Sequence, residues 1–351
     1  MPVSFIGWQS WSDCARPHRK SPPRYHSPHH KNVTQVHTPQ PISPRFPPPT
    51  GWCSWHYFGP YINEQIILDQ AKASVDLNLN LDYILIDDGW TTWGDWHTPD
   101  LRRFPHGLKW LVKQIKSLGL KAGLWWAPLL AKSSSKLFHR HPDWFIPNLE
   151  GTQVSPLDTF IRHKRRVLDL ENPQVAKYLK SVLDFFTDCG FKLLKSDYLY
   201  AFYFNPKFKS SQIPDSLLHQ LLAVIYQLPL FSVACGCPLA PAAGVVDAMR
   251  ISEDINIPHL KHLWPVNRLI HASRLRHLES NLKSRFSTRQ LWHLDPDAFI
   301  CHPAHGLTHH QVLRLQTLIN RANGLKFLGD NLALLSPVQI HGYISPLLSY
   351  R

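Results

Sequence analysis

The feature that most constrains the fold is a regular alternation of strand-like and helix-like segments from residue 51 onward. Eight short apolar runs have the length and composition of buried strands: 51–55, 82–87, 121–127, 191–197, 230–236, 247–252, 290–295 and 325–330. Eight strands that alternate with helices over about 300 residues predict an α/β fold, a (β/α)8 TIM barrel. A doubly wound open sheet is the alternative, and it is disfavoured because no G-x-G-x-x-G follows the first strand.

Three of the intervening segments carry helix signals. The stretch 63–78 has apolar residues near helical spacing, and 108–119 ends on Gly119, a typical residue after a helix. The stretch 172–190 opens with Asn172 before a proline and closes on a glycine. These signals predict helices between the strands of the barrel.

The first 50 residues have a different composition. Residues 15–50 hold ten of the 30 prolines and six Lys or Arg, with no Asp or Glu and few aliphatic residues. Such a composition buries too little apolar surface to fold alone. We therefore expect a short irregular N-terminal extension over 1–50 and the catalytic barrel over 51–345.

Charge and cysteine usage narrow the class of protein. The formal net charge is +13, but the excess is spread over several regions, and no zinc-finger, RNP-like or basic-zipper pattern is present, so no nucleic-acid partner is expected. Six scattered cysteines do not make a small disulfide scaffold. The start MPVSFIGWQSW does not resemble a signal peptide. The expectation is a cytoplasmic protein with no membrane association; its oligomeric state, a homo-oligomer included, is left open.

Polar and aromatic residues follow several of the expected strands where these end. Because the carboxyl ends of barrel strands meet at one rim, the following residues are expected near one another: Asp87, Asp88, Trp125, Lys195, Asp197, Cys235, Arg250 and Asp254. Each has a structural alternative, such as helix capping for the Asp pair, a structural ion pair for Lys195 with Asp197 or Arg250 with Asp254, and core packing for Trp125. Their joint occurrence at strand ends favours a functional site.

Two carboxylates on an aromatic-lined rim are typical of glycoside hydrolysis. One carboxylate must be ionised and nucleophilic, and the other must hold a proton near neutral pH. A lysine two residues away on the same strand face would keep Asp197 ionised, which predicts Asp197 as the nucleophile. Asp254 follows a different strand and is the candidate for the acid.

The chain resembles the catalytic barrel of the bacterial-type α-galactosidases, or melibiases, of glycoside hydrolase family 36. The stretches that carry the resemblance run collinearly from about residue 50 to 340: GWCSWHYF (51–58), LDYILIDDGW (81–90), GDW (94–96), FPHGLKWLVKQIKSLGLKAGLWWAP (104–128), HPDWF (141–145), VLDLENPQV (167–175), LLKSDYLYA (193–201), ACGCPLAPAAGVVDAMRISED (234–254), LDPDAF (294–299) and GLKFLGDNLALL (324–335). The blocks around Lys195-x-Asp197 and from Cys235 to Asp254 are the most specific.

The resemblance implies a retaining hydrolase of terminal α-galactosides, which needs neither a metal nor an organic cofactor. It implies Asp197 as nucleophile and Asp254 as acid/base. The implied substrate-binding residues fall into four groups: Asp87 and Asp88 for sugar hydroxyls, Lys195 and Arg250 for the hydroxyls next to the reacting carbon, Trp55 and Trp125 as pocket walls, and Cys235 against the sugar.

The resemblance also leaves alternatives. Members of this family usually carry a β-sandwich before the barrel and a β-domain after it, and here only GWQSWS (7–12) resembles the end of that sandwich. The N-terminal extension would then be a linker or a sandwich remnant. Other expectations are a galactosyltransferase of the raffinose-synthase type, an α-N-acetylgalactosaminidase, and a catalytically weak sugar-binding barrel.

Overall fold

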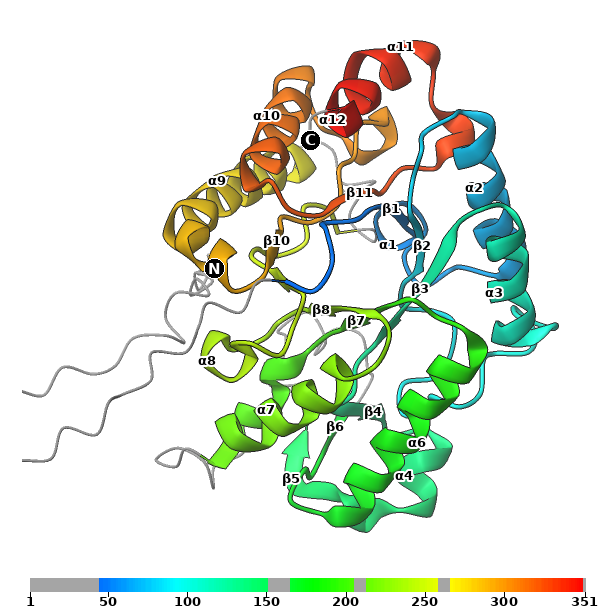
Figure 1. Ribbon diagram of the computed structural model, residues 1–351, viewed down its shortest axis with the longest axis vertical. Helices are drawn as coiled ribbons and strands as arrows, with labels where there is room; N and C mark the ends of the chain where they lie inside the picture. The colour runs from blue at the N-terminus through cyan, green and yellow to red at the C-terminus, as the bar shows by residue number, and fades with distance from the viewer. Residues whose placement is uncertain (1–43, 151–164, 205–212, 258–265, 350–351) are drawn as a thin grey trace, which may run out of the picture. The chain divides into compact units, whose positions relative to one another are not determined.

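Figure 1 presents a computed structural model of the protein, which describes residues 44–150, 165–204, 213–257 and 266–349. Eight parallel strands form one sheet in the order β10-β9-β8-β7-β3-β2-β1-β11. Each of the eight predicted strands corresponds to one of them: β1 (Thr50–Cys53), β2 (Tyr83–Ile86), β3 (Lys121–Trp126), β7 (Leu193–Ser196), β8 (Phe231–Ala234), β9 (Ala248–Arg250), β10 (His293–Asp295) and β11 (Lys326–Leu328).

The first and last strands of this order meet and close the sheet. The Leu325 amide donates to the Leu294 carbonyl at 3.0 Å, and Phe299, just beyond β10, pairs with Leu328 of β11 as an isolated parallel bridge. Closure leaves no unpaired edge between these strands. The predicted TIM barrel is therefore confirmed, and the open doubly wound sheet is wrong.

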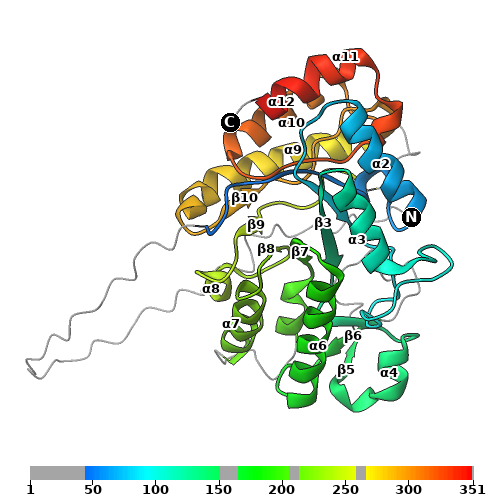
Figure 2. The same ribbon diagram turned by 45° about the vertical axis from the view of Figure 1, so that its right-hand side comes forward.

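Helices surround the barrel in Figures 1 and 2. Asn172 caps α6 by accepting from the Gln174 amide at 2.9 Å, and Gly190 ends that helix in a left-handed conformation, as the sequence signals predict. The helices are α1 (Trp55–Phe58), α2 (Glu64–Asp76), α3 (Gly107–Ser117), α4 (Lys136–Arg140), α6 (Pro173–Cys189), α7 (Ile213–Tyr226), α8 (Leu239–Ala242), α9 (Val266–Arg285), α10 (His309–Ala322), α11 (Pro337–Gln339) and α12 (Ser345–Ser349). Shorter helical turns are η2 (Pro142–Trp144), η4 (Leu199–Phe204), η7 (Phe286–Gln290), η8 (Pro303–His305), η9 (Leu332–Leu334) and the π-helical η10 (Ile340–Ile344).

Alternating strand residues divide the core into two clusters. Outward-facing side chains such as Ile84, Ile86 and Leu194 pack with the helices in the larger cluster. Inward-facing side chains fill the barrel in a second cluster: Cys53, Tyr83, Leu85, Leu193, Phe231, Val233, Ala248, Ala298, Leu325 and Phe327. Since side chains at i and i+2 of a strand share a face, Lys195 continues the inward row begun by Leu193.

A small antiparallel sheet, which the sequence did not predict, follows β3. It has the order β4-β6-β5, with β4 (Leu130–Lys132), β5 (Phe145–Glu150) and β6 (Arg165–Leu168). In Figures 1 and 2 this sheet lies with α4 beside α6, away from α9 and α10. Lys132 and Arg165 belong to it, and it therefore brings cations to the rim of the barrel.

The predicted division into 1–50 and 51–345 stays a prediction, because residues 1–43 lie outside the described part of the chain. The stretch GWQSWS (7–12) lies outside it as well. Among the helices that the structure describes, none is both long and apolar enough to cross a membrane. The cytoplasmic location stays a prediction.

Candidate active site

All nine predicted site residues lie at the carboxyl ends of barrel strands or just beyond them. Six strands supply them: Trp55 follows β1, Asp87 and Asp88 follow β2, Trp125 is in β3, Lys195 and Asp197 end and follow β7, Cys235 follows β8, and Arg250 and Asp254 end and follow β9. The rim at which TIM barrels hold their active sites therefore carries carboxylates, cations and indoles together.

Lys195 and Asp87 form a buried ion pair across the barrel interior. The Lys195 Nζ lies 2.8 Å from Asp87 Oδ2, and the two side chains are 5% and 3% exposed. Burial alone would lower the pKa of Lys195, but the charge of Asp87 outweighs it and raises that pKa well above its usual value. Asp87 also accepts from the Cys53 thiol and from the Asp88 amide.

This pairing corrects one sequence-based expectation. Lys195 was expected to accompany Asp197, but its ion pair is with Asp87. Lys195 points into the barrel interior, where Asp87 from the end of β2 lies within ion-pair distance. The hydrogen bonds given for the Asp197 carboxylate come instead from the Trp125 indole and the Tyr198 amide.

Asp197 is held by two donors at the end of β7. The Trp125 indole Nε1 donates to Oδ2 at 3.1 Å, and the Tyr198 amide donates to Oδ1 at 2.6 Å. The loop after β8 also comes close: a Cβ added at Gly236 would lie 3.5 Å from Asp197 Oδ1 and 2.9 Å from the Tyr200 ring. These contacts fix the orientation of the carboxylate, as the positioning of a nucleophile requires.

Asp254 lies beyond β9 and is partly open to solvent, with 39% of its side chain exposed. The Trp55 indole Nε1 donates to Oδ2 at 2.9 Å, and Arg250 Nη1 pairs with Oδ1 at 3.1 Å. The ion pair between Arg250 and Asp254, which the sequence offered as a structural alternative, is thus present. Although the side chain is partly exposed, the protein around it displaces part of its hydration, and this loss together with the negative charge of Asp297 raises the pKa of Asp254, while Arg250 opposes the rise.

Asp88 is the second carboxyl with a raised pKa. Burial raises the pKa of Asp88 to about 6, although the Trp93 indole, which donates to Oδ1 at 2.7 Å, and Lys132 act in the opposite direction. Arg165 lies over the Trp93 ring at 3.9 Å. Arg165 of the inserted sheet thus packs against the indole that donates a hydrogen bond to Asp88.

Three residues that the sequence analysis did not single out complete the charged network. Arg250 Nε pairs with Asp295 at 2.9 Å, and Arg250 Nη2 pairs with Asp297 at 2.9 Å. Asp297 in turn faces the His56 Nε2 at 3.0 Å. Asp295 ends β10, so the strand-end rule that identified Asp87 could also have found it in LDPDAF; His56, within a short helix, gave no such signal.

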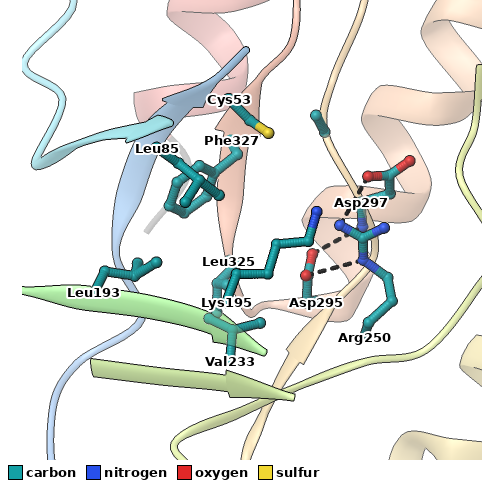
Figure 3. A pocket seen from close by; sticks show the side chains of 11 residues that line it. Cys53, Leu85, Leu193, Lys195, Val233, Arg250, Asp295, Asp297, Leu325 and Phe327 are labelled. Carbon is teal, nitrogen blue, oxygen red and sulfur yellow. Dashed lines mark hydrogen bonds and ion pairs between the residues drawn. The ribbon is translucent and has the colours of Figure 1, made fainter. Parts of the chain in front are cut away.

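Figure 3 views the barrel interior beneath this network, with Arg250 joined to Asp295 and Asp297 and with Lys195 nearby. The side chains enclose a cavity of about 20 Å³, with Cys53, Leu85 and Phe327 among its lining. This volume is enough for about one water molecule. Cys235 is 7% exposed, and burial followed by the charge of Asp197 raises its pKa well above the usual value, so this thiol is neutral.

The carboxylates of this rim belong to the residue types that serve in acid–base and nucleophilic catalysis. Among the described residues, no three His, Cys, Asp or Glu side chains are grouped so as to hold a metal ion. The charged groups instead pair with one another, as buried charges must.

Comparison with known proteins identifies the family. The family model described as Melibiase matches residues 49–227, about half of the chain. The chain belongs to the Melibiase family. This match begins just before β1 and ends just after α7, so it includes Asp87, Lys195 and Asp197, and the resemblance inferred from the sequence is confirmed.

Curated relatives of this chain include α-galactosidases. Alpha-galactosidase AgaA of Geobacillus stearothermophilus is 35% identical over 109 residues, which are 27% of this chain and 14% of that protein. Probable alpha-galactosidase C of Aspergillus terreus is 29% identical over 164 residues, 41% of this chain and 21% of that protein. The matched part of this chain thus spans only about a fifth or less of these relatives.

Solved structures agree on the fold. TtGalA, an α-galactosidase from Thermus thermophilus in complex with stachyose, has a TM-score of 0.72 at 23% identity, covering 88% of this chain and 67% of that one. The GH36 α-galactosidase AgaA from Geobacillus stearothermophilus has a TM-score of 0.59 at 19% identity, covering 87% and 42%. Both likenesses extend over most of this chain and show its fold.

Proposed function

We propose that this melibiase is a retaining α-galactosidase that hydrolyses terminal α-galactosides by double displacement. The observation that carries the proposal is a pair of carboxylates, Asp197 and Asp254, that follow two different barrel strands and are each oriented by an indole N–H. The substrate class is supported by the relatives, since TtGalA was solved with stachyose and with p-nitrophenyl α-D-galactopyranoside.

The two carboxylates take different roles because their surroundings differ. Asp197 accepts from Trp125 and from the Tyr198 amide, which stabilise a negative charge. The raised pKa of Asp254 favours the protonated carboxyl that the leaving oxygen requires. The contrast is the one expected when one carboxyl attacks and the other protonates.

In the first step, Asp197 forms a bond to the anomeric carbon as the bond from that carbon to the departing oxygen breaks. Asp254 transfers its proton to that oxygen, so the aglycone leaves as a neutral alcohol. In the second step, Asp254 removes a proton from water, and the water oxygen displaces Asp197 from the anomeric carbon. Two inversions give net retention of configuration.

The remaining predicted residues bind the sugar in this proposal. Asp87 and Asp88 accept hydrogen bonds from galactose hydroxyls, and Lys195 and Arg250 donate to the hydroxyls beside the reacting carbon. Trp55 offers a ring wall, Trp125 walls the site and also orients Asp197, and Cys235 lies against the sugar. No metal or organic cofactor takes part in these steps.

The test is hydrolysis of p-nitrophenyl α-galactoside, with the α-glucoside and the α-N-acetylgalactosaminide in parallel. We expect preference for the galactoside and a loss of roughly a thousandfold or more in kcat for Asp197→Ala. The matched control is Asp184→Ala, which removes an exposed carboxylate on α6 and should retain activity. A folded wild-type protein inactive on all three glycosides, or an active Asp197→Ala, would contradict the proposal.

A further inference from the structure

Asp297 is a buried carboxylate that contacts the residue next to Asp254. It is 1% exposed and lies just beyond β10. Its Oδ2 accepts from the Ile255 amide at 2.6 Å, and its Oδ1 faces His56 Nε2 at 3.0 Å and Arg250 Nη2 at 2.9 Å. One carboxylate thus joins the backbone that follows Asp254 to the cation that pairs with Asp254.

The backbone of Asp297 is held in an uncommon conformation. Its φ is +84°, a region that residues with side chains seldom adopt, and its amide donates to Asp295 Oδ1 at 3.0 Å. Such a conformation persists only where surrounding contacts determine it, and it occurs often at functional sites. The contacts of the Asp297 carboxylate with Arg250, His56 and Ile255 hold its backbone in this conformation.

The charges around Asp254 come from four elements. Arg250 at the end of β9, His56 on α1 and Lys195 on β7 are cations or become so on protonation, and Asp297 beyond β10 is an anion. Burial is outweighed by Arg250 and His56, which hold the pKa of Asp297 well below its usual range. Arg250 divides its single charge among Asp254, Asp295 and Asp297. Asp254 therefore receives only part of the stabilisation that one arginine can give a carboxylate.

We propose that Asp297 is a positioning residue that fixes the backbone beside Asp254, draws Arg250 away from full pairing with Asp254, and thereby keeps Asp254 protonated for the first step of hydrolysis. This inference rests on the proposed assignment of Asp254 as the acid. Asp297 itself does not touch the substrate. Its charge sets which form of Asp254 predominates before the leaving oxygen takes the proton.

The direction of the effect follows from electrostatics. A like charge disfavours ionisation, so the anion at Asp297 raises the pKa of Asp254. Asp297→Asn removes that anion and releases Arg250 toward Asp254, and both changes favour ionised Asp254. Asparagine also tolerates a positive φ, so the backbone conformation can be kept.

The experiment follows Asp254 directly in protein labelled with carbon-13 at aspartate carboxyls, with the Asp254 signal assigned by its loss in Asp254→Asn. In Asp297→Asn we expect the Asp254 titration to move to lower pH by roughly one unit or more. The basic limb of kcat/KM on p-nitrophenyl α-galactoside should move by the same amount. The loss of kcat at neutral pH should be larger on stachyose, whose leaving group needs the proton, than on the p-nitrophenyl glycoside.

Asp247→Asn is the matched control. Asp247 is also fully buried and charged, but it precedes β9 at the other end of the barrel, where it pairs with Arg45 and Ser232. We expect it to lower stability without moving the Asp254 titration. If Asp297→Asn does not fold, His56→Gln provides the test, because loss of that cation should move the titration to higher pH.

Outcomes for the two proposals are separable. The role of Asp297 is overturned if the Asp254 titration in folded Asp297→Asn stays where it is in wild type or moves to higher pH. Where His56→Gln is used instead, the role is overturned if the titration stays in place or moves to lower pH. The titration does not require turnover, so it still tests Asp297 if the wild-type protein fails to hydrolyse galactosides. That failure would overturn the proposed function instead.

Discussion

Replacing Lys195 by methionine tests how far the rim depends on the buried ion pair. The change keeps most of the side-chain volume but leaves Asp87, whose side chain is 3% exposed, without the cation that lies 2.8 Å away. Removing one member of a buried pair typically costs about 3–5 kcal/mol of folding stability, because the other charge stays buried.

The surroundings of Asp87 indicate the lower part of that range. Asp87 keeps the Asp88 amide at 2.9 Å and the weaker Cys53 thiol at 3.4 Å. Lys195 itself lines a cavity of about 20 Å³, which can hold about one water molecule beside the substituted side chain. We therefore expect Lys195→Met to lower the free energy of unfolding by about 3 kcal/mol.

Urea unfolding of four proteins measures this cost: wild type, Lys195→Met, Asp87→Asn and the double variant. The double variant has no orphan charge, so it should be more stable than Lys195→Met alone, with a coupling energy of about 2 kcal/mol. A cost below about 1 kcal/mol for Lys195→Met, or strictly additive single changes, would refute the reasoning.

Three further predictions concern neighbouring contacts. Trp125→Phe removes the indole donor from Asp197. It should lower kcat on p-nitrophenyl α-galactoside roughly 10- to 100-fold with the fold intact, which is the range expected for a hydrogen bond to a charged group. An unchanged kcat would contradict the orienting role of Trp125. Asp88→Asn should stabilise the protein at pH 7 by about 1–2 kcal/mol, as measured by thermal or urea unfolding. The pKa of Asp88 rises from 3.8 to about 6 on folding, so its ionisation destabilises the folded state progressively as the pH rises through that interval. A variant that is no more stable than wild type at pH 7 would count against this prediction. The same variant should raise KM for galactosides, and an unchanged KM would remove Asp88 from the sugar site.

The barrel was predictable because each of its strands and helices has a signal within a short stretch of sequence. Each strand is a short apolar run, and helix ends such as Asn172 and Gly190 carry their own capping signals. The inserted sheet was missed because β4 and β5 both pair with β6 across long sequence separations, and three short strands of mixed composition resemble a loop.

The charged network was predictable only in part. Arg250 and Asp254 are four residues apart, and their ion pair was one of the alternatives that the sequence offered. The partner of Lys195 could not be predicted, because Asp87 is 108 residues away in the sequence and comes close only through the fold of the barrel. His56 and Asp297 are far apart in the sequence and come into contact only in the closed barrel, so no short motif predicts their contact.

The central claim is that Asp197 attacks the anomeric carbon, and trapping the covalent intermediate tests it most directly. A fluorinated α-galactosyl fluoride should react with the wild-type protein, release fluoride and add the mass of one fluorogalactosyl group. Peptide mapping by mass spectrometry should place that mass on Asp197, and Asp197→Ala should not be labelled. A label on another residue would contradict the account, as would turnover of p-nitrophenyl α-galactoside with β-galactose as the first product.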